Sequence, residues 1–592
     1  MNCIYKNFIY KIKQVVLLVS VTVHFYATFG QHIADFTSVQ PGNQTTDLIL
    51  PSTHTFQYLI ETGDPLTAGG TLPDRCDFTG YVPINGSSTE GYISINSEDT
   101  PGGVTVLDVQ LDLGNKKWNV LASEAVDFSG VGGTRENCSG TVTPWGTVIS
   151  CEESLPGATM PNGYKQYGWC IEIDPAAKVV VNNQKLWRLG NMKHENVVIH
   201  QNERTVYFGE DLPTGGNVYK FVANTAGDLT NGSLYVLQAS IVTGTGQWLM
   251  LNNNTPSECN STKSQAASAG ASFYAGVEDV EISPIDGNVY FAVKNEATVY
   301  RFTDDDPMGG GTVSNYQIFV GGSPTFGYLI NWGVGASTEN WGTGNDNLAF
   351  DDLGNLWVLQ DGSKNYIWVV ENGHTQAIPK VKLFARTPDG CEPTGITFSP
   401  DFKYLFMSIM HPNASNSATT QLDAFGNPKS FDEDVAIVIS RKEFLGDSSG
   451  MAVEVLHFDA TLTNKGIELS FSLSEEPFSV IIEKYENQKF TTWKTLEPFG
   501  TVYQQIDTNP KPGWNDYRLS LIDVNGEFSQ SEIVSVYVSN QSYRDNSFTG
   551  LVQLYNMQGQ LIYQGVLSKL PKLQSGIYII KGGKEYKKIF IQ

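Results

Sequence analysis

The chain has 592 residues, of which 40% are hydrophobic and 11% aromatic, so it has enough apolar material for several packed domains and is not intrinsically disordered. It carries 38 Lys and Arg against 62 Asp and Glu, a formal net charge of −24. Proteins that bind a nucleic-acid backbone need clustered Lys and Arg, so this composition excludes that class and we expect no nucleic-acid partner. Residues 1–30 and 541–592 are net basic, which leaves the acidic excess in the middle and predicts an affinity for cations there.

Residues 1–30 have the layout of a secretory signal peptide. Three lysines precede an apolar run from Val15 to Val23, and small residues follow up to Gly30. The run is shorter than the roughly 20 residues that a membrane-spanning helix needs, and no later stretch is long or apolar enough. We therefore expect export, a mature chain without a transmembrane segment, and a final location that is secreted or attached to the cell surface.

Cysteine usage leaves two readings open. In an oxidising compartment, the six cysteines that remain after removal of Cys3 favour three disulfides. Cys138 is also a candidate metal thiolate, and a Cys138–Cys151 disulfide competes with that interpretation. The six are Cys76, Cys138, Cys151, Cys170, Cys259 and Cys391.

Residues 31–446 read as short strands separated by Gly, Asn and Asp turns, with one theme repeated along the chain. Each copy is an alternating strand, a turn with Asp, Asn or Gly, and a second strand with an aromatic residue. Such repeats predict a β-propeller, here of about six blades with insertions. The copies lie at 197–211, 280–295, 348–362 and 396–412, with a weaker one at 140–154.

The chain changes character after residue 446. Residues 447–540 alternate without the repeated theme, which is typical of a β-sandwich of immunoglobulin or fibronectin size, and we interpret them as a spacer. Residues 541–592 form two predicted hairpins ending in a basic strand. The predicted fold class is therefore all-β: a propeller, a sandwich and a small β domain.

Carboxylates recur at a fixed distance from the repeated strands. Glu195 and Glu278 each lie twelve residues before the aromatic residue of their copy, Asp346 lies eleven before, and Glu392 lies thirteen before Leu405. Equivalent positions of different blades converge on the propeller axis, where unpaired carboxylates would repel one another. The pattern therefore predicts a metal site with hard oxygen ligands, and Cys138 would add a soft ligand that favours iron.

The motifs around these acids resemble those of the PhoX-type alkaline phosphatases, exported calcium-dependent enzymes built on a β-propeller. The resemblance runs from about residue 130 to 412. The matching motifs, in the family's order, are Asn137-Cys138-Ser139-Gly140, Thr143-Pro144-Trp145-Gly146-Thr147, Cys151-Glu152-Glu153, Lys193-His194-Glu195, Val277-Glu278-Asp279, Asp346-Asn347-Leu348-Ala349-Phe350-Asp351 and Glu392-Pro393-Thr394-Gly395.

This resemblance implies a cluster of Fe³⁺ and Ca²⁺ that hydrolyses small phosphate esters without a side-chain nucleophile. Glu392 joins the ligand set from the repeat pattern, and His194 is a candidate to hydrogen-bond a ligating carboxylate. Spacing favours Glu153 over Glu152. Carried over residue by residue, the implied ligands are Cys138, Glu153, Glu195, Glu278 and Asp346.

One position departs from the family pattern. An Arg-Pro pair precedes the glutamate in the family, and that arginine holds the substrate phosphate, whereas this chain has Gly276-Val277. Arg135 and Arg386 are candidates to replace it. The departure keeps two alternatives open: a non-catalytic, metal-stabilised surface propeller, and a propeller hydrolase of another class such as a calcium-dependent lactonase.

The last unit resembles the C-terminal sorting domain of the type IX secretion system. Members of that family end in a strand similar to Gly576-Ile577-Tyr578-Ile579 and a Lys-rich final strand, here Lys587-Lys588-Ile589. The resemblance implies that residues 541–592 are recognised by the type IX secretion machinery.

Overall fold

The structure is a computed structural model of the chain. It describes residues 32–446 except 155, 156, 334 and 363, and, with short gaps between strands, residues 453–538 and 551–591. The chain divides into two compact units, Met1–Ser449 and Gly450–Gln592. The predicted signal peptide lies outside the described residues. None of the described helices is both long enough and apolar enough to cross a membrane.

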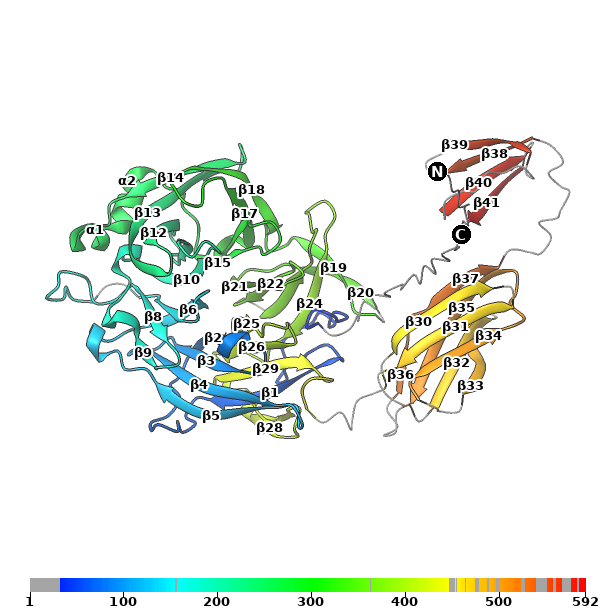
Figure 1. The fold of residues 1–592 in the computed structure, drawn as a ribbon, viewed down its shortest axis with the longest axis horizontal. Coiled ribbons are helices and arrows are strands. Elements are labelled where there is room, and N and C mark those ends of the chain that lie inside the picture. The colour runs from blue at the N-terminus through cyan, green and yellow to red at the C-terminus, as the bar shows by residue number, and fades with distance from the viewer. Residues whose placement is uncertain are drawn as a thin grey trace, which may run out of the picture. The chain divides into compact units, whose positions relative to one another are not determined.

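The first unit is a β-propeller of six blades (Figure 1). The innermost strands of consecutive blades lie next to each other around a closed ring. This arrangement confirms the predicted fold. The innermost strands are β2 (Cys76–Pro83), β6 (Asn137–Val142), β10 (His194–Ile199), β15 (Val277–Ile282), β21 (Asn345–Phe350) and β25 (Glu392–Phe398).

Further strands follow outward in each blade. Those of the first three blades are β3 (Glu90–Ser97), β4 (Gly103–Asp112) and β5 (Lys117–Ala125); β7 (Val148–Glu152), β8 (Cys170–Asp174) and β9 (Val179–Val180); and β11 (Thr205–Glu210), β12 (Val218–Thr225), β13 (Asp228–Ser240) and β14 (Thr245–Leu251). Those of the last three are β16 (Val289–Val293), β17 (Thr298–Asp304) and β18 (Thr312–Gly321); β22 (Leu356–Gln360), β23 (Tyr366–Val370) and β24 (Val381–Arg386); and β26 (Tyr404–Met410), β29 (Val435–Arg441) and β1 (His54–Glu61).

The N-terminal strand closes the propeller. β1 pairs antiparallel with β29, with Phe56 opposite Ile439, and becomes the outermost strand of the sixth blade. The first and last strands of the unit are thus hydrogen-bonded to each other. A closed ring protects the edges that an open sheet would expose.

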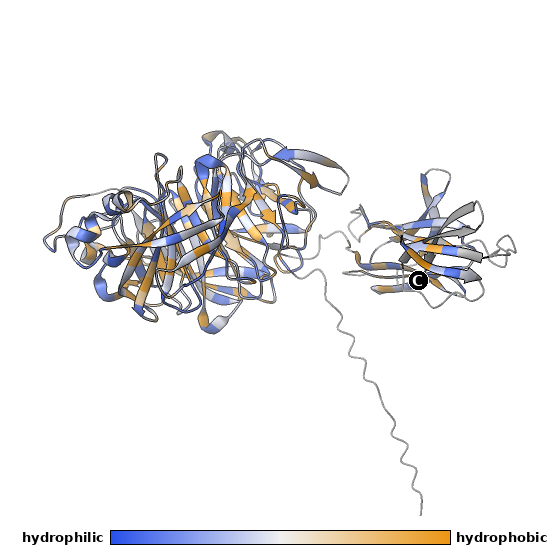
Figure 2. Ribbon diagram, turned by 90° about the horizontal axis from the view of Figure 1, so that it is seen from above, coloured by the Kyte–Doolittle hydropathy of each residue, from blue (hydrophilic) through white to orange (hydrophobic). Residues whose placement is uncertain are grey.

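The inner strands are apolar because each blade packs between two neighbours. All five residues of β16 and all five of β22 are buried, and such β-branched and aromatic side chains favour strands. Tyr290 of β16 meets Phe350 of β21 across a blade boundary, with ring centroids 5.0 Å apart. Figure 2 shows hydrophobic segments concentrated on the strands of this unit.

Insertions between strands explain the uneven spacing of the sequence copies. Helices α1 (Pro256–Asn260) and α2 (Thr262–Ala269) follow β14, and Thr255 and Glu258 form a capping box at the start of α1. Two hairpins are also inserted: β19 (Gly327–Asn331) with β20 (Ala336–Asn340), and β27 (Gln421–Leu422) with β28 (Pro428–Lys429).

The second unit contains three sheets. Two of them share one apolar core that includes Phe471, Ile482 and Leu519, as a sandwich requires; its immunoglobulin-like type stays a prediction. The third sheet contains the two hairpins expected near the C-terminus. The strands are β30 (Val455–Thr463), β31 (Gly466–Leu473) and β34 (Val502–Asp507); β33 (Lys489–Leu496), β32 (Ser479–Glu486), β35 (Gly513–Ile522), β36 (Phe528–Gln530) and β37 (Val534–Val538); and β39 (Leu561–Val566), β38 (Leu551–Asn556), β40 (Gly576–Gly582) and β41 (Glu585–Ile591).

Candidate metal centre

The innermost strands share a β-bulge at one place. In the third blade His194 pairs with Glu210 and Val197 with Phe208, so two residues of β10 oppose only Gly209. Such a bulge redirects the unpaired side chains. We call the first unpaired residue the bulge position. In the first five blades it is occupied by Asp77, Cys138, Glu195, Glu278 and Asp346.

The sixth blade has the same bulge with a neutral residue. Thr394 pairs with Ser408 and Ile396 with Met407, so Thr394 and Gly395 together oppose Ser408, and Thr394 takes the place equivalent to the bulge position. Its hydroxyl donates a hydrogen bond to Asp77 of the first blade. Glu392, expected at this position, is instead two residues earlier. It lies thirteen residues before Leu405, whereas Thr394 lies eleven before it, the same count as from Asp346 to Trp357.

In the third, fourth and fifth blades the residue after the bulge position forms a hydrogen bond to the next blade. The Asn196 amide donates to the carbonyl of Val280 at 3.1 Å and accepts from its N–H at 2.8 Å. Asp279 accepts from the N–H of Leu348 at 2.9 Å, and Asn347 from that of Gly395 at 3.1 Å. These bonds between blades hold the bulge side chains in place.

A second ring surrounds the bulge positions. In each of the first five blades, the residue directly after the second strand donates its N–H to the carbonyl of the residue two before the bulge position. We call the place of the residue that donates this N–H the strand-end position. The bonds are Glu98 to Arg75 (2.9 Å), Glu153 to Glu136 (2.9 Å), Asp211 to Lys193 (3.1 Å), Lys294 to Gly276 (3.0 Å) and Asp361 to Gly344 (2.8 Å).

The two rings bring together two sets of candidate ligands. Within each set one ligand atom per residue lies within 4.8 Å of the others. We call Glu98, Cys138 and Glu153 the cysteine group, and Glu195, Glu278 and Asp346 the carboxylate group. The thiol of Cys138 links the groups, because its Sγ lies 3.0 Å from Oδ2 of Asp77 and 3.2 Å from Oε1 of Glu195.

Burial and mutual repulsion dominate the electrostatics of the site. Burial, followed by the charges of Glu278 and Asp346, raises the pKa of Glu195 well above its usual range. Burial likewise raises the pKa of Asp77 to about 7 and that of Glu98 to about 7. The pKa of the Cys138 thiol is also raised by burial. A bound cation would offset the free-energy cost of burying these groups in their charged forms close to one another.

Two lysines contact the groups. Lys193 pairs with Glu153. The Nζ atom of Lys294 lies 3.0 Å from Asp346 and 3.8 Å from Glu278, and 2.8 Å from Asp361 at the strand-end position of the next blade. Among the described residues, no other basic side chain forms an ion pair with a member of either group.

Glu152, the last residue of β7, and Glu153, directly after it, have different partners, and it is Glu153 that lies among the candidate ligands, as the spacing predicts. Glu152 is fully buried and accepts from Lys185 at 2.7 Å and from the Thr134 hydroxyl at 3.0 Å, so it serves a structural ion pair. Glu153 lies in the cysteine group. Glu392 lies in neither group. Burial and the charge of Asp361, at the strand-end position of the fifth blade, raise its pKa well above the usual range.

Three other candidates lie differently from what we expected. Arg135 contacts Glu136 and Thr100. Arg386 is on β24, the outermost strand of its blade, and donates to the carbonyl of Asn43, so it points away from the ring. His194 contacts the carbonyl of Gly190 through Nε2 at 2.9 Å rather than a ligating carboxylate. Consecutive strand residues face opposite sides, and Glu195 takes the side toward the cluster.

Sequence reasoning missed four acids of the site: Asp77, Glu98, Asp211 and Asp361. A signal was present for Asp211 and Asp361, whereas Glu98 lies in a blade without a recognised repeat copy. The second strand of several repeat copies ends in an acid, as in the Phe208-Gly209-Glu210-Asp211 segment and in Leu359-Gln360-Asp361. Asp77 belongs to a blade in which no repeat copy was recognised.

The cysteines do not form the three predicted disulfides. All six described cysteines are buried and free. Cys138 faces carboxylates, so it does not pair with Cys151, whose Sγ lies 3.6 Å from that of Cys170 on the neighbouring strand. The metal interpretation of Cys138 therefore fits the geometry, and the Cys138–Cys151 disulfide does not.

The residues fit the implied metal ions. Oε1 of Glu278 and Oδ1 of Asp211 are buried without a hydrogen-bond partner, which is costly unless a cation completes them. The carboxylate oxygens suit Ca²⁺, and a thiolate with carboxylates suits iron. Both groups therefore offer the donor types that the sequence predicted.

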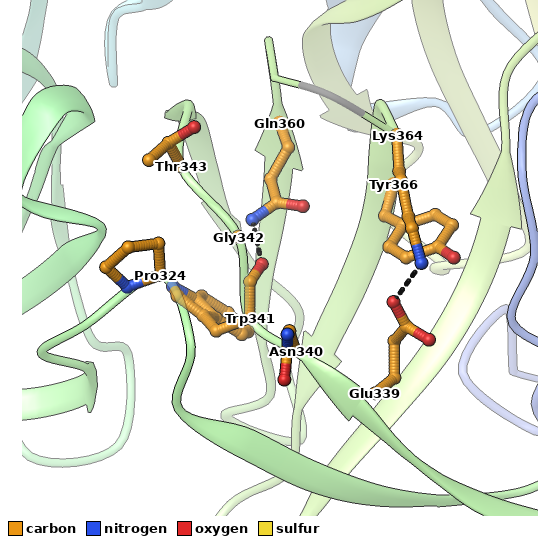
Figure 3. A pocket seen from close by; sticks show the side chains of 9 residues that line it. All are labelled: Pro324, Glu339, Asn340, Trp341, Gly342, Thr343, Gln360, Lys364 and Tyr366. Atoms are coloured by element: carbon orange, nitrogen blue, oxygen red, sulfur yellow. Dashed lines mark hydrogen bonds and ion pairs between the residues drawn. The ribbon is translucent and has the colours of Figure 1, made fainter.

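A cavity of about 220 Å³ lies at the fifth blade and is lined by residues of β20, β22 and β23 (Figure 3). Thr343, three residues before Asp346, contributes to its lining, and the Lys364–Glu339 ion pair lies at one side. Figure 3 shows Gln360 reaching the carbonyl of Trp341, at 2.6 Å, on the other side. The mixture of aromatic and polar side chains suits a small polar organic group.

The family follows from a match over more than half of the chain. Residues 105–413 match the family model described as alkaline phosphatase PhoX. The chain belongs to the PhoX alkaline phosphatase family. No curated protein matches it. Among solved structures it is similar to Pseudomonas fluorescens PhoX in complex with vanadate, a transition state analogue, with 21% identity and a TM-score of 0.55 over 69% of this chain and 98% of the other.

Other solved structures are less similar. The periplasmic gluconolactonase of Pseudomonas aeruginosa has 11% identity and a TM-score of 0.32, covering 66% of this chain and 96% of its own. The calcium-binding protein regucalcin from Agrobacterium tumefaciens has 11% identity and a TM-score of 0.34, covering 70% and 96%. The similarity to the Pseudomonas fluorescens protein supports the propeller fold.

Proposed function

We propose that this protein is an exported, metal-dependent phosphatase that hydrolyses small phosphate esters at a Ca²⁺ and Fe³⁺ cluster in the propeller channel. The observation that carries the proposal is the convergence of the cysteine group and the carboxylate group from five blades at one end of the ring. Membership of the PhoX family supplies the reaction class. A lactonase that uses a single calcium ion would not need a buried thiolate among the carboxylates. A non-catalytic, metal-stabilised propeller would use the same ligands, so an activity measurement has to separate it from the phosphatase.

The proposed ligands are Cys138, Glu153, Glu195, Glu278 and Asp346. Asp77 and Glu98 lie close enough to Cys138 and Glu153 to join them, and Glu392 would act at the edge through Asp361. Bound Ca²⁺ and Fe³⁺ would supply Lewis-acid chemistry to the phosphoryl group.

The chain's own contribution is to hold the ligand side chains in position. The bonds between blades fix the bulge side chains before the metal enters, so little reorganisation is needed on binding. The Cys138 thiol has to lose its proton when it ligates, because thiolates and not thiols bind metals. Since burial raises its pKa, metal binding and the release of this proton are coupled.

The remaining segments serve export in this proposal. Residues 1–30 would direct the chain across the inner membrane, residues 447–540 would act as a spacer, and residues 541–592 would be recognised by the type IX secretion machinery. The mature enzyme would be secreted or attached to the cell surface. A reporter protein with residues 1–30 at its N-terminus and residues 541–592 at its C-terminus should reach the surface of a host with that machinery, and should stay in the periplasm if the proposed role of residues 541–592 is wrong.

The test of the phosphatase is hydrolysis of a chromogenic phosphomonoester by the mature chain supplied with Ca²⁺ and Fe³⁺. The Glu195→Gln variant and an EDTA-treated sample are the controls. Activity that requires metal and is lost in the variant supports the proposal. A folded, metal-loaded protein without activity on monoesters and diesters would favour the non-catalytic propeller.

A further inference from the structure

The strand-end ring contains one exception to its chemistry. In four of the first five blades this position is occupied by a carboxylate: Glu98, Glu153, Asp211 or Asp361. The fourth blade has Lys294 there, held by the same N–H bond, at 3.0 Å, to the carbonyl of Gly276. A lysine in a ring of acids changes the local charge by two units relative to a carboxylate at the same position. Lys294 therefore places a positive charge where the other four blades place a negative one.

The ammonium group lies at the edge of the carboxylate group. Its short contacts to Asp346 and Asp361 use two of its three N–H groups, and Glu278 at 3.8 Å is too distant for a hydrogen bond. The side chain is 28% exposed, whereas the side chain of Glu278 is 3% exposed. Lys294 therefore combines contact with the candidate ligands and access from solvent.

Gly276 supplies no cation to this part of the site. Its φ of +85° disfavours larger residues, and a Cβ there would lie 2.8 Å from Oδ1 of Asp211. Arg135 and Arg386 are engaged elsewhere, and Lys193 pairs with Glu153. Lys294 is thus the basic residue that reaches the carboxylate group.

We propose that Lys294 binds a non-bridging oxygen of the substrate's phosphoryl group, which makes it a catalytic residue of this chain. The inference rests on the proposed function, because it takes the substrate to be a phosphate ester. An incoming phosphate dianion is repelled by the many carboxylates of the rings, and a lysine fixed beside the metal ligands offsets that repulsion on the substrate side. Metal ions at the two groups would satisfy Asp346 and free the ammonium for the phosphoryl oxygen.

The test compares the mature wild-type chain with Lys294→Met, which removes the charge and keeps the length. Each protein is loaded with Ca²⁺ and Fe³⁺, its metal content is measured by mass spectrometry, and the binding of inorganic phosphate and of vanadate is measured by calorimetry. We expect unchanged metal content, about 10- to 100-fold weaker anion binding, which is the range for a lost charge-assisted hydrogen bond, and a similar fall in kcat/KM. Lys294→Arg should restore part of the anion affinity.

Lys382→Met is the matched control. Lys382 is 33% exposed and pairs with Glu371 at 2.8 Å, but it lies on the outermost strand β24. Its removal should leave anion binding unchanged. Anion affinity in Lys294→Met equal to that of the wild type would overturn the proposal. If that variant also binds an additional metal ion, Lys294 takes the place of a metal ion and does not bind the substrate.

The outcomes separate this inference from the proposed function. If the wild-type protein binds phosphate and loses that binding on removal of Lys294 but hydrolyses no ester, the phosphatase proposal fails and the anion site stands. If the wild-type protein hydrolyses esters and Lys294→Met has the same anion affinity and kcat/KM, the phosphatase proposal stands and the assignment of Lys294 fails. A metal-loaded wild type that binds no phosphate or vanadate contradicts both.

Discussion

The Sγ atom of Cys138 lies 3.2 Å from Oε1 of Glu195, although 57 residues separate them in the chain. They occupy the bulge positions of consecutive blades, the second and the third. Placing a thiol and a carboxylate on equivalent bulges of adjacent blades is how this propeller builds a mixed soft and hard donor set. The first predictions follow from this pair.

Replacement of Cys138 by serine should shift metal selectivity. The thiolate is the soft ligand of the cysteine group, and the carboxylates around it are hard ligands that suit Ca²⁺. The Cys138→Ser protein should lose most of its iron while retaining most of its calcium. Metal analysis after loading with both ions measures this. Equal loss of the two metals would indicate that Cys138 does not discriminate between them.

Glu195→Gln should stabilise the metal-free protein and remove its response to metal. Burial and the charges of Glu278 and Asp346 penalise the Glu195 carboxylate when no cation is bound. In EDTA at pH 7.5 the melting temperature of the variant should therefore be at least that of the wild type. Added Ca²⁺ should raise the melting temperature of the wild type by more than it raises that of the variant. A variant that is strongly destabilised in EDTA would contradict this view of the site.

Cys151 and Cys170 should form a disulfide in the exported protein. The N–H of Glu152 donates to the carbonyl of Trp169, which makes Cys151 and Cys170 a non-hydrogen-bonded pair. In such pairs the Cα atoms are about 4.5 Å apart, within the range that disulfides span. A cellular thiol–disulfide oxidant would accept the two electrons while the thiols release their protons.

Thiol counting measures the oxidation of this pair. After unfolding, protein purified from the periplasm should show four alkylatable thiols in place of six, and a peptide joining residues 151 and 170. Cys151→Ser should lower the melting temperature of that protein by more than it lowers the melting temperature of the reduced wild type. Six reactive thiols in protein exposed to glutathione disulfide would rule the bond out.

Acid should weaken the propeller partly through His54. Burial, with the nearby charge of Arg441, lowers the pKa of His54 from 6.5 to about 3 in the folded protein. Between these values the unfolded chain binds a proton that the folded chain does not, so stability is lost as the pH falls from about 6.5 toward 3. His54→Gln should remove this contribution, which is about 1.4 kcal/mol per pH unit.

Denaturant unfolding at pH 7, 5.5 and 4.5, monitored by tryptophan fluorescence, measures the effect of His54. The difference in unfolding free energy between wild type and variant should shrink steadily with falling pH. A constant difference across that range would mean that the ring does not stay neutral in the fold.

The sequence predicted those parts of the site that repeat with the strands. Glu195, Glu278 and Asp346 keep a nearly constant distance to an aromatic strand, because a bulge, a strand and a tight turn have the same lengths in their blades. Glu392 joined the predicted set because its count of thirteen residues to Leu405 was accepted beside counts of eleven and twelve, whereas strand pairing gives the equivalent place to Thr394. The bonds between blades and the contacts of Lys294 depend on residues far apart in the chain, which a single sequence does not reveal.

The closure of the ring was also beyond the sequence. β1 precedes β29 by almost 400 residues, and its pairing depends on the whole propeller being formed, not on a local pattern. The two-sheet core of the second unit was more accessible, since strict alternation along β31, with Ile467, Leu469 and Phe471 buried, identifies the inward face directly.

The central claim is that the two rings hold metal ions that act on phosphate esters. Its most direct test is metal analysis and phosphomonoester hydrolysis on one preparation of the mature chain, with Glu195→Gln prepared in parallel. The account predicts that the wild type binds calcium and iron and hydrolyses the ester, and that the variant binds less of both and has lost at least 99% of the activity. A wild-type protein that hydrolyses the ester equally well after complete removal of its metals would contradict the account.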